Sequence, residues 1–204
     1  MPEQTRDLAG ASDEELMRRT ADGDRDAFAA LYRRHHATIH RFARLMTGSN
    51  SMAEDVVQEV FLALMRNASR FDASRSALST YLYGVARHHT RRRLFRERRF
   101  VPFGNGTCDI EESPADGDTA ADLERRSDLE RLRRAIVSLP SRYREVVVLC
   151  DLQDVTYGDA ASALGCAIGT VRSRLHRARQ LLMQKMRHGA DATAVTGTTM
   201  RCTV

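Results

Sequence analysis

The sequence predicts an all-α protein in which two small helical domains are joined by an acidic, flexible linker. Apolar residues recur every three or four positions along most of the chain, which is the spacing of helices with one buried face. Residues 103–118 are rich in Gly and Asp and lose this periodicity. The net charge also changes sign, from +5 in residues 1–100 to −6 in residues 101–128 and +6 in residues 129–204.

These changes divide the chain into a first domain at 10–100, a linker at 101–126, a second domain at 127–188 and a disordered tail at 189–204. Hydrophobic residues fill 42% of the 204 positions, which is enough for two small cores and too few for a large single-core enzyme. No apolar run approaches the ~20 residues of a membrane span. The N-terminus also lacks the apolar core of a secretory signal. We therefore expect a cytoplasmic protein with no membrane contact of its own.

Three helices are expected in the first domain. The first takes Asp22 or Asp24 as its cap and ends at residues 48–51. The second begins at once, because Ser51 and Glu54 have the spacing of a capping box. The third runs from about residue 79 to residue 99.

The second of these helices has two contrasting faces. Its valines form a buried stripe, and polar residues lie opposite them together with one exposed leucine. An exposed apolar side chain among polar ones is typical of a protein interface, although a plain solvated face is the alternative. The candidate protein-binding residues are Asp55, Gln58, Glu59 and Leu62.

The third helix ends in an almost continuous basic segment at residues 87–99, with Tyr81, Tyr83 and Phe95 near it. Aromatic rings stack on bases and guanidinium groups hold phosphates, so this pattern favours a nucleic-acid surface. A charge run is often only a solvated face, and that alternative stays open. The small polar loop at residues 71–77 could receive an unstacked base.

The second domain has the spacing of a helix-turn-helix. Ser141 is expected to cap one helix, Thr156 and Asp159 to start the next, and Gly165 to supply the left-handed turn after it. The last helix is expected to pack inward through Ile168, Val171 and Leu175. Its outward residues could reach base edges or hold phosphates, and they are Thr170, Arg172, Ser173, His176, Arg177 and Arg179.

Taken together, these motifs resemble the extracytoplasmic-function (ECF) sigma factors, members of the sigma-70 family of bacterial RNA polymerase, over residues 12–187. Residues 13–32 resemble the opening of the family's region 2, and residues 55–61 match its polymerase-binding helix. Residues 139–149 and 157–179 match its region 4.

The resemblance implies a subunit that binds core RNA polymerase and directs initiation at promoters without being an enzyme. The four candidate protein-binding residues would contact the clamp helices of the largest subunit, and the polymerase flap is a further expected contact. The outward residues of the helix-turn-helix would read the −35 element as duplex DNA. The −10 element would be opened and read by Asp72, Ser74, Arg75, Ser76, Tyr81, Arg87, His88 and Arg91.

The resemblance also implies a partner. Members of the family are commonly held inactive by an anti-sigma factor, so one is expected here. The acidic linker would run toward the RNA channel of the polymerase. The family often has Trp where this chain has Tyr81, and Asn where it has His88. Tyrosine keeps a stacking face, so promoter melting is expected to survive the first change.

Two other functions fit part of the sequence. A two-domain helix-turn-helix regulator that does not bind polymerase would explain the basic helix but not the protein-binding face. An enzyme would need an assembled site. The four cysteines lack zinc spacing, His36 and His40 lack a completing Glu, and there is no phosphate-binding glycine loop. We therefore expect no catalytic residue, no metal and no cofactor.

Overall fold

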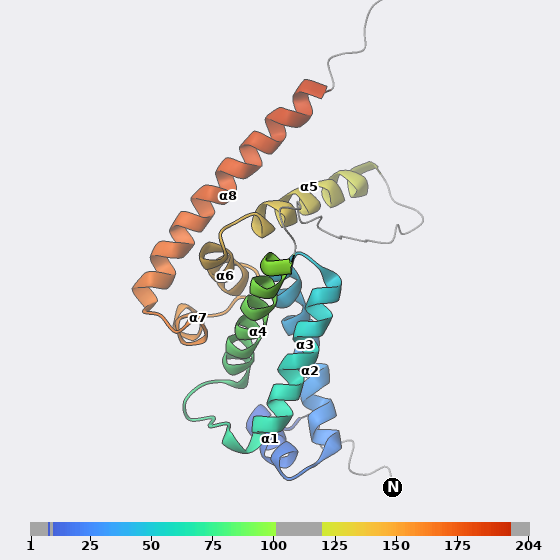
Figure 1. The fold of residues 1–204 in the computed structure, drawn as a ribbon, viewed down its shortest axis with the longest axis vertical. Helices are drawn as coiled ribbons and strands as arrows, with labels where there is room; N and C mark the ends of the chain where they lie inside the picture. Colours follow the sequence, from blue (N-terminus) through green and yellow to red (C-terminus); the bar gives the residue numbers. More distant parts are fainter. Residues whose placement is uncertain (1–7, 9, 101–119, 197–204) are drawn as a thin grey trace, which may run out of the picture.

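The computed structural model describes residue 8, residues 10–100 and residues 120–196, and the regular secondary structure of these residues is all helical (Figure 1). The all-α prediction is confirmed for this part of the chain, whereas residues 101–119, the body of the predicted linker, lie outside the described residues. None of the described helices is long and apolar enough to cross a membrane. The elements in order are α1 (Asp13–Ala21), α2 (Arg25–Thr47), α3 (Asn50–Asn67), a short 3-10 turn (Ala68–Arg70), α4 (Leu78–Phe100), α5 (Ala120–Val137), α6 (Ser141–Cys150), α7 (Tyr157–Leu164) and α8 (Ile168–Thr196).

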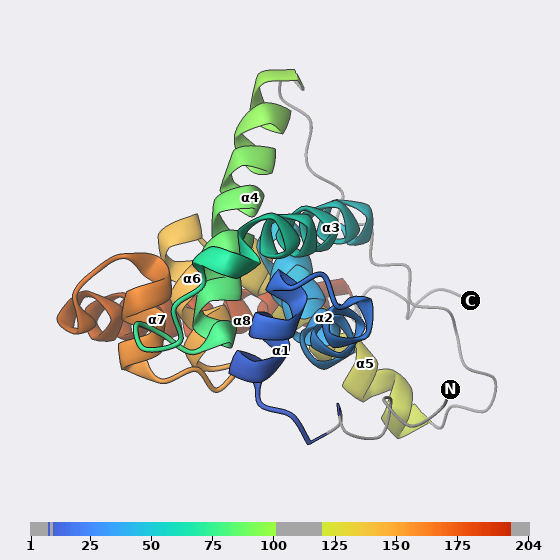
Figure 2. The same cartoon turned by 90° about the horizontal axis from the view of Figure 1, so that it is seen from below.

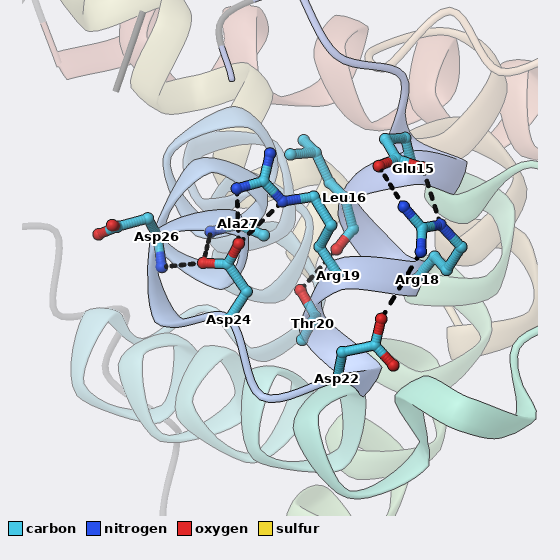
Figure 3. A network of polar contacts seen from close by, with 9 residues as sticks. All are labelled: Glu15, Leu16, Arg18, Arg19, Thr20, Asp22, Asp24, Asp26 and Ala27. Atoms are coloured by element: carbon cyan, nitrogen blue, oxygen red, sulfur yellow. Dashed lines mark hydrogen bonds and ion pairs between the residues drawn. The ribbon is translucent and has the colours of Figure 1, made fainter. Parts of the chain in front are cut away.

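The corner between α1 and α2 is held by Asp24, the N-cap of α2 (Figure 3). Its Oδ1 accepts the backbone N–H groups of Asp26 at 2.9 Å and Ala27 at 3.1 Å, and its Oδ2 accepts the Arg19 Nε–H at 2.8 Å. The Ala27 N–H bond is the largest cause that lowers the pKa of Asp24, and the Arg19 bond follows it. One carboxylate therefore starts α2 and fixes the end of α1 against it.

Two predicted caps are wrong by one or two residues. Helix α3 is capped by Ser49, whose Oγ accepts the Met52 N–H at 3.4 Å, and not by Ser51. The left-handed Gly48 turns the chain so early that Ser49 is already extended and the helix starts at Asn50. Helix α6 has Pro140 at its N-cap, without a side-chain hydrogen bond, so the predicted cap Ser141 is its first helical residue.

The N-terminal half is a bundle in which α2, α3 and α4 pack around one apolar core. Its largest side chains are almost fully buried, because each helix directs one apolar stripe inward at helical spacing. Two rings extend this core: Phe42 lies edge-on to Tyr83, with 5.5 Å between ring centroids. The principal core residues are Leu31, Phe42, Met46, Val56, Val60, Leu64, Leu78 and Leu82.

The C-terminal half contains the predicted helix-turn-helix in α7 and α8. Gly165 adopts a φ of 62° and ends α7, and the small Ala160 and Ala161 are buried where the two helices cross. Val171 and Leu175 of α8 face inward as predicted. Ile168 does not: it is 45% exposed because it is the first residue of α8, before the buried stripe begins.

Helices α5 and α8 are longer than the sequence predicts. Helix α5 begins at Ala120, so residues 120–126, assigned to the linker, are helical. Helix α8 continues to Thr196, so residues 189–196, assigned to the disordered tail, are helical as well. Alanine has the highest helix propensity and occurs in both extensions, which favours their helical state, and the single Gly189 does not stop α8.

The two halves are packed against each other and share one continuous core (Figures 1 and 2). Figure 2 shows α4 standing between α3 on one side and α6 and α7 on the other, and α2 also packs on α6. Polar contacts cross this boundary. The Tyr83 hydroxyl donates to Gln153 Oε1 at 3.4 Å, and an Arg144 guanidinium N–H donates to the Met46 carbonyl. The sequence predicts two domains but does not predict this interface.

We expect Thr156→Ala to lower the free energy of unfolding by about 1 kcal/mol, the usual effect of losing an N-cap. Thr156 Oγ1 accepts the Asp159 N–H at 3.1 Å and donates to its carboxylate at 2.6 Å, so the change removes both bonds. Urea denaturation followed by circular dichroism measures the effect. Thr156→Ser keeps the hydroxyl and serves as the control; equal losses in both variants would contradict the role of the cap.

We also expect stability to fall at alkaline pH partly through Tyr83. Burial raises the pKa of Tyr83 from 10.0 to about 12, so between these values the unfolded chain has lost this phenol proton while the folded chain retains it. The free energy of unfolding therefore decreases as pH rises through this window. Denaturation midpoints at pH 10 and pH 12 measure the slope. It should be smaller in Tyr83→Phe, and an unchanged slope would contradict the assignment.

Candidate functional site

The polar face of α3 projects away from the core. Gln58 and Glu59 are exposed, and Asp55 is half-buried at the same edge of the helix. Leu62 is half-buried rather than exposed as predicted, because it lines a cleft of about 550 Å³ between α2 and α3. Apolar side chains line much of this cleft, and Met65 beside it is 52% exposed. A polar rim next to an open apolar cleft is the composition of a protein-binding surface.

The carboxylates of this face already have partners on α4. Asp55 forms an ion pair with Arg93. Glu59 Oε2 lies 3.9 Å from His89 Nδ1, and burial lowers the pKa of His89 below its ordinary value, so the ring is mostly neutral at pH 7. Both carboxylate side chains remain about half exposed, at 42% for Asp55 and 57% for Glu59. They can therefore accept a second cation from outside.

The loop before α4 is shaped by Asp72. Its Oδ1 accepts the Ser74 hydroxyl at 2.6 Å and the Ser74 backbone N–H at 2.9 Å, and these two bonds lower the pKa of Asp72. This carboxylate thus holds the turn, in which Arg75 is exposed and Ser76 is half-buried. Tyr81 follows on α4 with its ring edge-on to Phe71, the centroids 5.6 Å apart.

The α4 residues predicted to bind DNA do not share one free surface. His88 and Arg91 are exposed. Arg87 instead faces the C-terminal half, where its Nε lies 3.2 Å from Oε2 of Glu145, a carboxylate that is only 3% exposed. Tyr81 lines two clefts of about 380 Å³ each that Ser162 of α7 also lines. The structure therefore brings part of this set into the contact between the two halves.

The outward face of α8 is open. The exposed residues there include Arg172, Ser173, His176 and Arg177, and Thr170 is half-buried at the start of the helix. The Ser173 hydroxyl donates to the Thr170 carbonyl at 3.1 Å. Arg179, predicted to hold a phosphate, is instead bound to Asp151 through bonds of 3.1 and 2.6 Å, which raise the pKa of this arginine.

Sequence reasoning missed the acidic partners of these arginines. Glu145 and Asp151 have no local pattern that marks them, because each pairs with a residue distant in the chain. It also missed Tyr157, whose ring is 39% exposed and has the Arg172 guanidinium 6.0 Å from its centroid. The only available signal was its place at the start of the predicted helix-turn-helix. His36 and His40 stack with ring centroids 5.9 Å apart, but no third ligand completes a metal site within the described residues.

Comparisons with known proteins agree with the division of the chain into an N-terminal and a C-terminal half. Residues 31–100 match the family Sigma-70 region 2, and residues 129–182 match the family Sigma-70, region 4. The ECF RNA polymerase sigma factor SigM of Mycobacterium tuberculosis is 36% identical over 173 residues, covering 84% of this chain and 83% of SigM. SigW of Bacillus subtilis, also an ECF RNA polymerase sigma factor, is 30% identical, covering 81% of this chain and 91% of SigW.

A solved structure extends the likeness to the arrangement of the two halves. The structure of CnrH in complex with the cytosolic domain of CnrY superposes with a TM-score of 0.66 at 25% identity, over 87% of this chain and 99% of that one. A plain helix-turn-helix regulator would share region 4 alone, whereas the similarity here runs through both regions in order. The chain therefore belongs to the ECF sigma factors of the sigma-70 family, which act in transcription initiation and are not enzymes.

Proposed function

We propose that this chain is a dissociable specificity subunit that works in the cytoplasm, binds core RNA polymerase and selects promoters through their −10 and −35 elements. The observation that carries the proposal is the pairing of two separate surfaces in one chain: the polar face of α3 beside its apolar cleft, and the exposed face of α8. The first suits a protein partner and the second suits duplex DNA.

The polymerase-binding surface is assigned to Asp55, Gln58, Glu59 and Leu62. Gln58 and Glu59 are exposed, and Leu62 continues into the α2–α3 cleft. A coiled coil with basic and apolar side chains would satisfy the carboxylates and fill the cleft at the same time. This is the expected chemistry for the clamp helices of the largest polymerase subunit.

Duplex reading is assigned to α8. An exposed α-helix fits into the major groove of DNA. There Arg172 can form a bidentate hydrogen bond with a guanine edge, and Ser173 or His176 can reach neighbouring bases. Arg177 is exposed, and we assign it to a backbone phosphate. Because Asp151 engages Arg179, we assign this arginine the lesser role of fixing α8 against the end of α6.

Reading of the −10 element is assigned to the loop and the exposed end of α4. Unstacking a base costs a few kcal/mol, which stacking on Tyr81 and contacts from the loop must offset. Arg75, His88 and Arg91 are exposed and can hold the strand. Tyrosine in place of the tryptophan common in the family retains the stacking face but offers less area.

An anti-sigma factor is the expected regulatory partner. Two structurally similar proteins were solved as complexes: CnrH with the cytosolic domain of CnrY, and the sigma factor RpoE with the anti-sigma factor NepR from Bartonella quintana. The second superposes with a TM-score of 0.58 at 24% identity and supports the fold alone. An inhibitor that covers the α3 face or separates α8 from DNA would silence this chain by the surfaces assigned above.

Replacing Gln58 and Glu59 together with Ala should weaken binding to purified core polymerase by about tenfold or more, the effect of losing an energetically important interface contact. Fluorescence anisotropy of labelled protein measures the affinity. Glu14→Ala, an exposed acidic residue on α1, is the control and should bind normally. Unchanged affinity in the double variant would contradict the assignment of this surface, whereas duplex binding without any core binding by the unmodified chain would favour the plain regulator.

Arg172→Ala should relax the sequence preference at one position of the −35 element. The free-energy difference between binding of the preferred base and of the other bases at that position should fall by about 1–3 kcal/mol. Selection of duplexes from a random pool by the reconstituted holoenzyme gives the preference of each variant. Arg187→Ala, an exposed arginine farther along the same helix, should leave the selected sequence intact. Identical selected sequences for Arg172→Ala and the unmodified chain would exclude direct base contact by Arg172.

A further inference from the structure

We propose that Gln180 is a positioning residue for DNA reading by α8: it holds His176 as a neutral ring that offers Nδ1–H, a hydrogen-bond donor, to the edge of a base. The inference deepens the proposed function, because it assumes that the exposed face of α8 reads the −35 element. A donor at this place recognises acceptor groups in the major groove, and guanine and thymine present acceptors there without a competing donor.

Gln180 lies one turn after the two side chains that it contacts. Its Oε1 accepts the Nη1–H of Arg177 at 3.1 Å, and its Nε2 lies 3.0 Å from Nε2 of His176. Spacings of three and four residues place all three side chains on one side of the helix. His176 and Arg177 are exposed, and Gln180 is half-buried. One amide therefore joins two exposed side chains on the face assigned to duplex DNA.

The orientation of the Gln180 amide follows from Arg177. A guanidinium has N–H donors and no acceptor, so the amide atom that faces it must be the carbonyl oxygen. The amide nitrogen therefore faces His176, and an amide nitrogen donates but does not accept. The reversed amide would place N–H groups against the guanidinium and would lose the bond to Arg177. The contact with Arg177 thus fixes the group that His176 meets.

The amide nitrogen in turn decides which ring nitrogen of His176 carries the proton. Nε2 of the ring must accept the bond at 3.0 Å, so this nitrogen has no proton. An imidazolium carries a proton on both nitrogens and cannot accept, which means that the bonded ring is neutral. Its single N–H is then on Nδ1. Because His176 is exposed, Nδ1–H is the group that the ring offers to DNA.

The two bonds restrict side chains that would otherwise change their hydrogen-bonding role. A neutral imidazole without a partner exchanges between two tautomers, and one of them presents an acceptor at Nδ1. One hydrogen bond of ordinary net strength shifts such an equilibrium by about two- to tenfold. The same amide engages one N–H of Arg177 and leaves the other guanidinium donors for a phosphate. Gln180 thus acts through His176 and Arg177.

Gln180→Glu tests this role. A carboxylate still accepts from Arg177 but has no N–H, so Nε2 of His176 must then carry the proton and donate it. Gln184→Glu adds the same charge one turn farther along α8 and is the matched control. Nitrogen-15 NMR of the labelled full chain at about pH 8, where histidines are ordinarily neutral, identifies the protonated ring nitrogen. Loss of signals in His176→Gln assigns the ring.

The unmodified chain and Gln184→Glu should carry the proton of His176 on Nδ1, and Gln180→Glu should carry it on Nε2. Duplex selection by the reconstituted holoenzyme measures the consequence at the position that His176→Ala relaxes. There the ratio of guanine and thymine to cytosine and adenine should fall about threefold or more in Gln180→Glu. The position read by Arg172 should keep its preference in the same variant.

A proton on Nε2 in the unmodified chain, or the same tautomer in that chain and in Gln180→Glu, would overturn the positioning role whatever the DNA result. A tautomer change with an unchanged base ratio would overturn reading by Nδ1–H, as would a His176→Ala variant that relaxes no position. If the unmodified holoenzyme selected no sequence at all, the proposed function would be contradicted instead, and the NMR result would still decide the role of Gln180.

Discussion

Helix α4 is the element on which the rest of the arrangement depends, because three structures compete for its surface. One face, including Leu78, Leu82 and Ala86, is buried in the core with α2 and α3. A second face meets α7, and Arg87 on α4 reaches Glu145 in the middle of α6. Only the remaining strip, with His88 and Arg91, is left to solvent. The core and the C-terminal half therefore leave only part of the circumference of α4 open to a further partner.

Ion pairs with carboxylates occupy several of the arginines of this chain. The arginine-rich sequence has a net charge of +5, yet Arg87, Arg93 and Arg179 each face a carboxylate contributed by another helix or its edge. The exposed pairs add little stability, since water and salt screen them. Their larger effect is on which arginines can bind a phosphate. An arginine paired with Asp151 or Asp55 binds a phosphate only after that carboxylate is displaced. Arg172 of α8 lies over the Tyr157 ring rather than against a carboxylate, so this condition does not apply to it.

Local signals in the sequence predict local structure well here. Asp24, Thr156 and Gly165 act as caps and turn as expected, because capping requires only neighbours three or four positions away. Ser49 rather than Ser51 is the N-cap of α3, because Gly48 turns the chain immediately before Ser49. The site is less predictable. That Arg87 faces Glu145 depends on how two halves dock across residues outside the described chain, and no spacing rule relates positions so far apart.

The difference between α4 and α8 follows from where each helix finds its buried neighbours. Helix α8 directs Val171, Leu175 and Ala178 along a single stripe toward α6 and α7, which leaves the opposite side of the helix exposed. Helix α4 lies between two bodies, so its free surface depends on their separation.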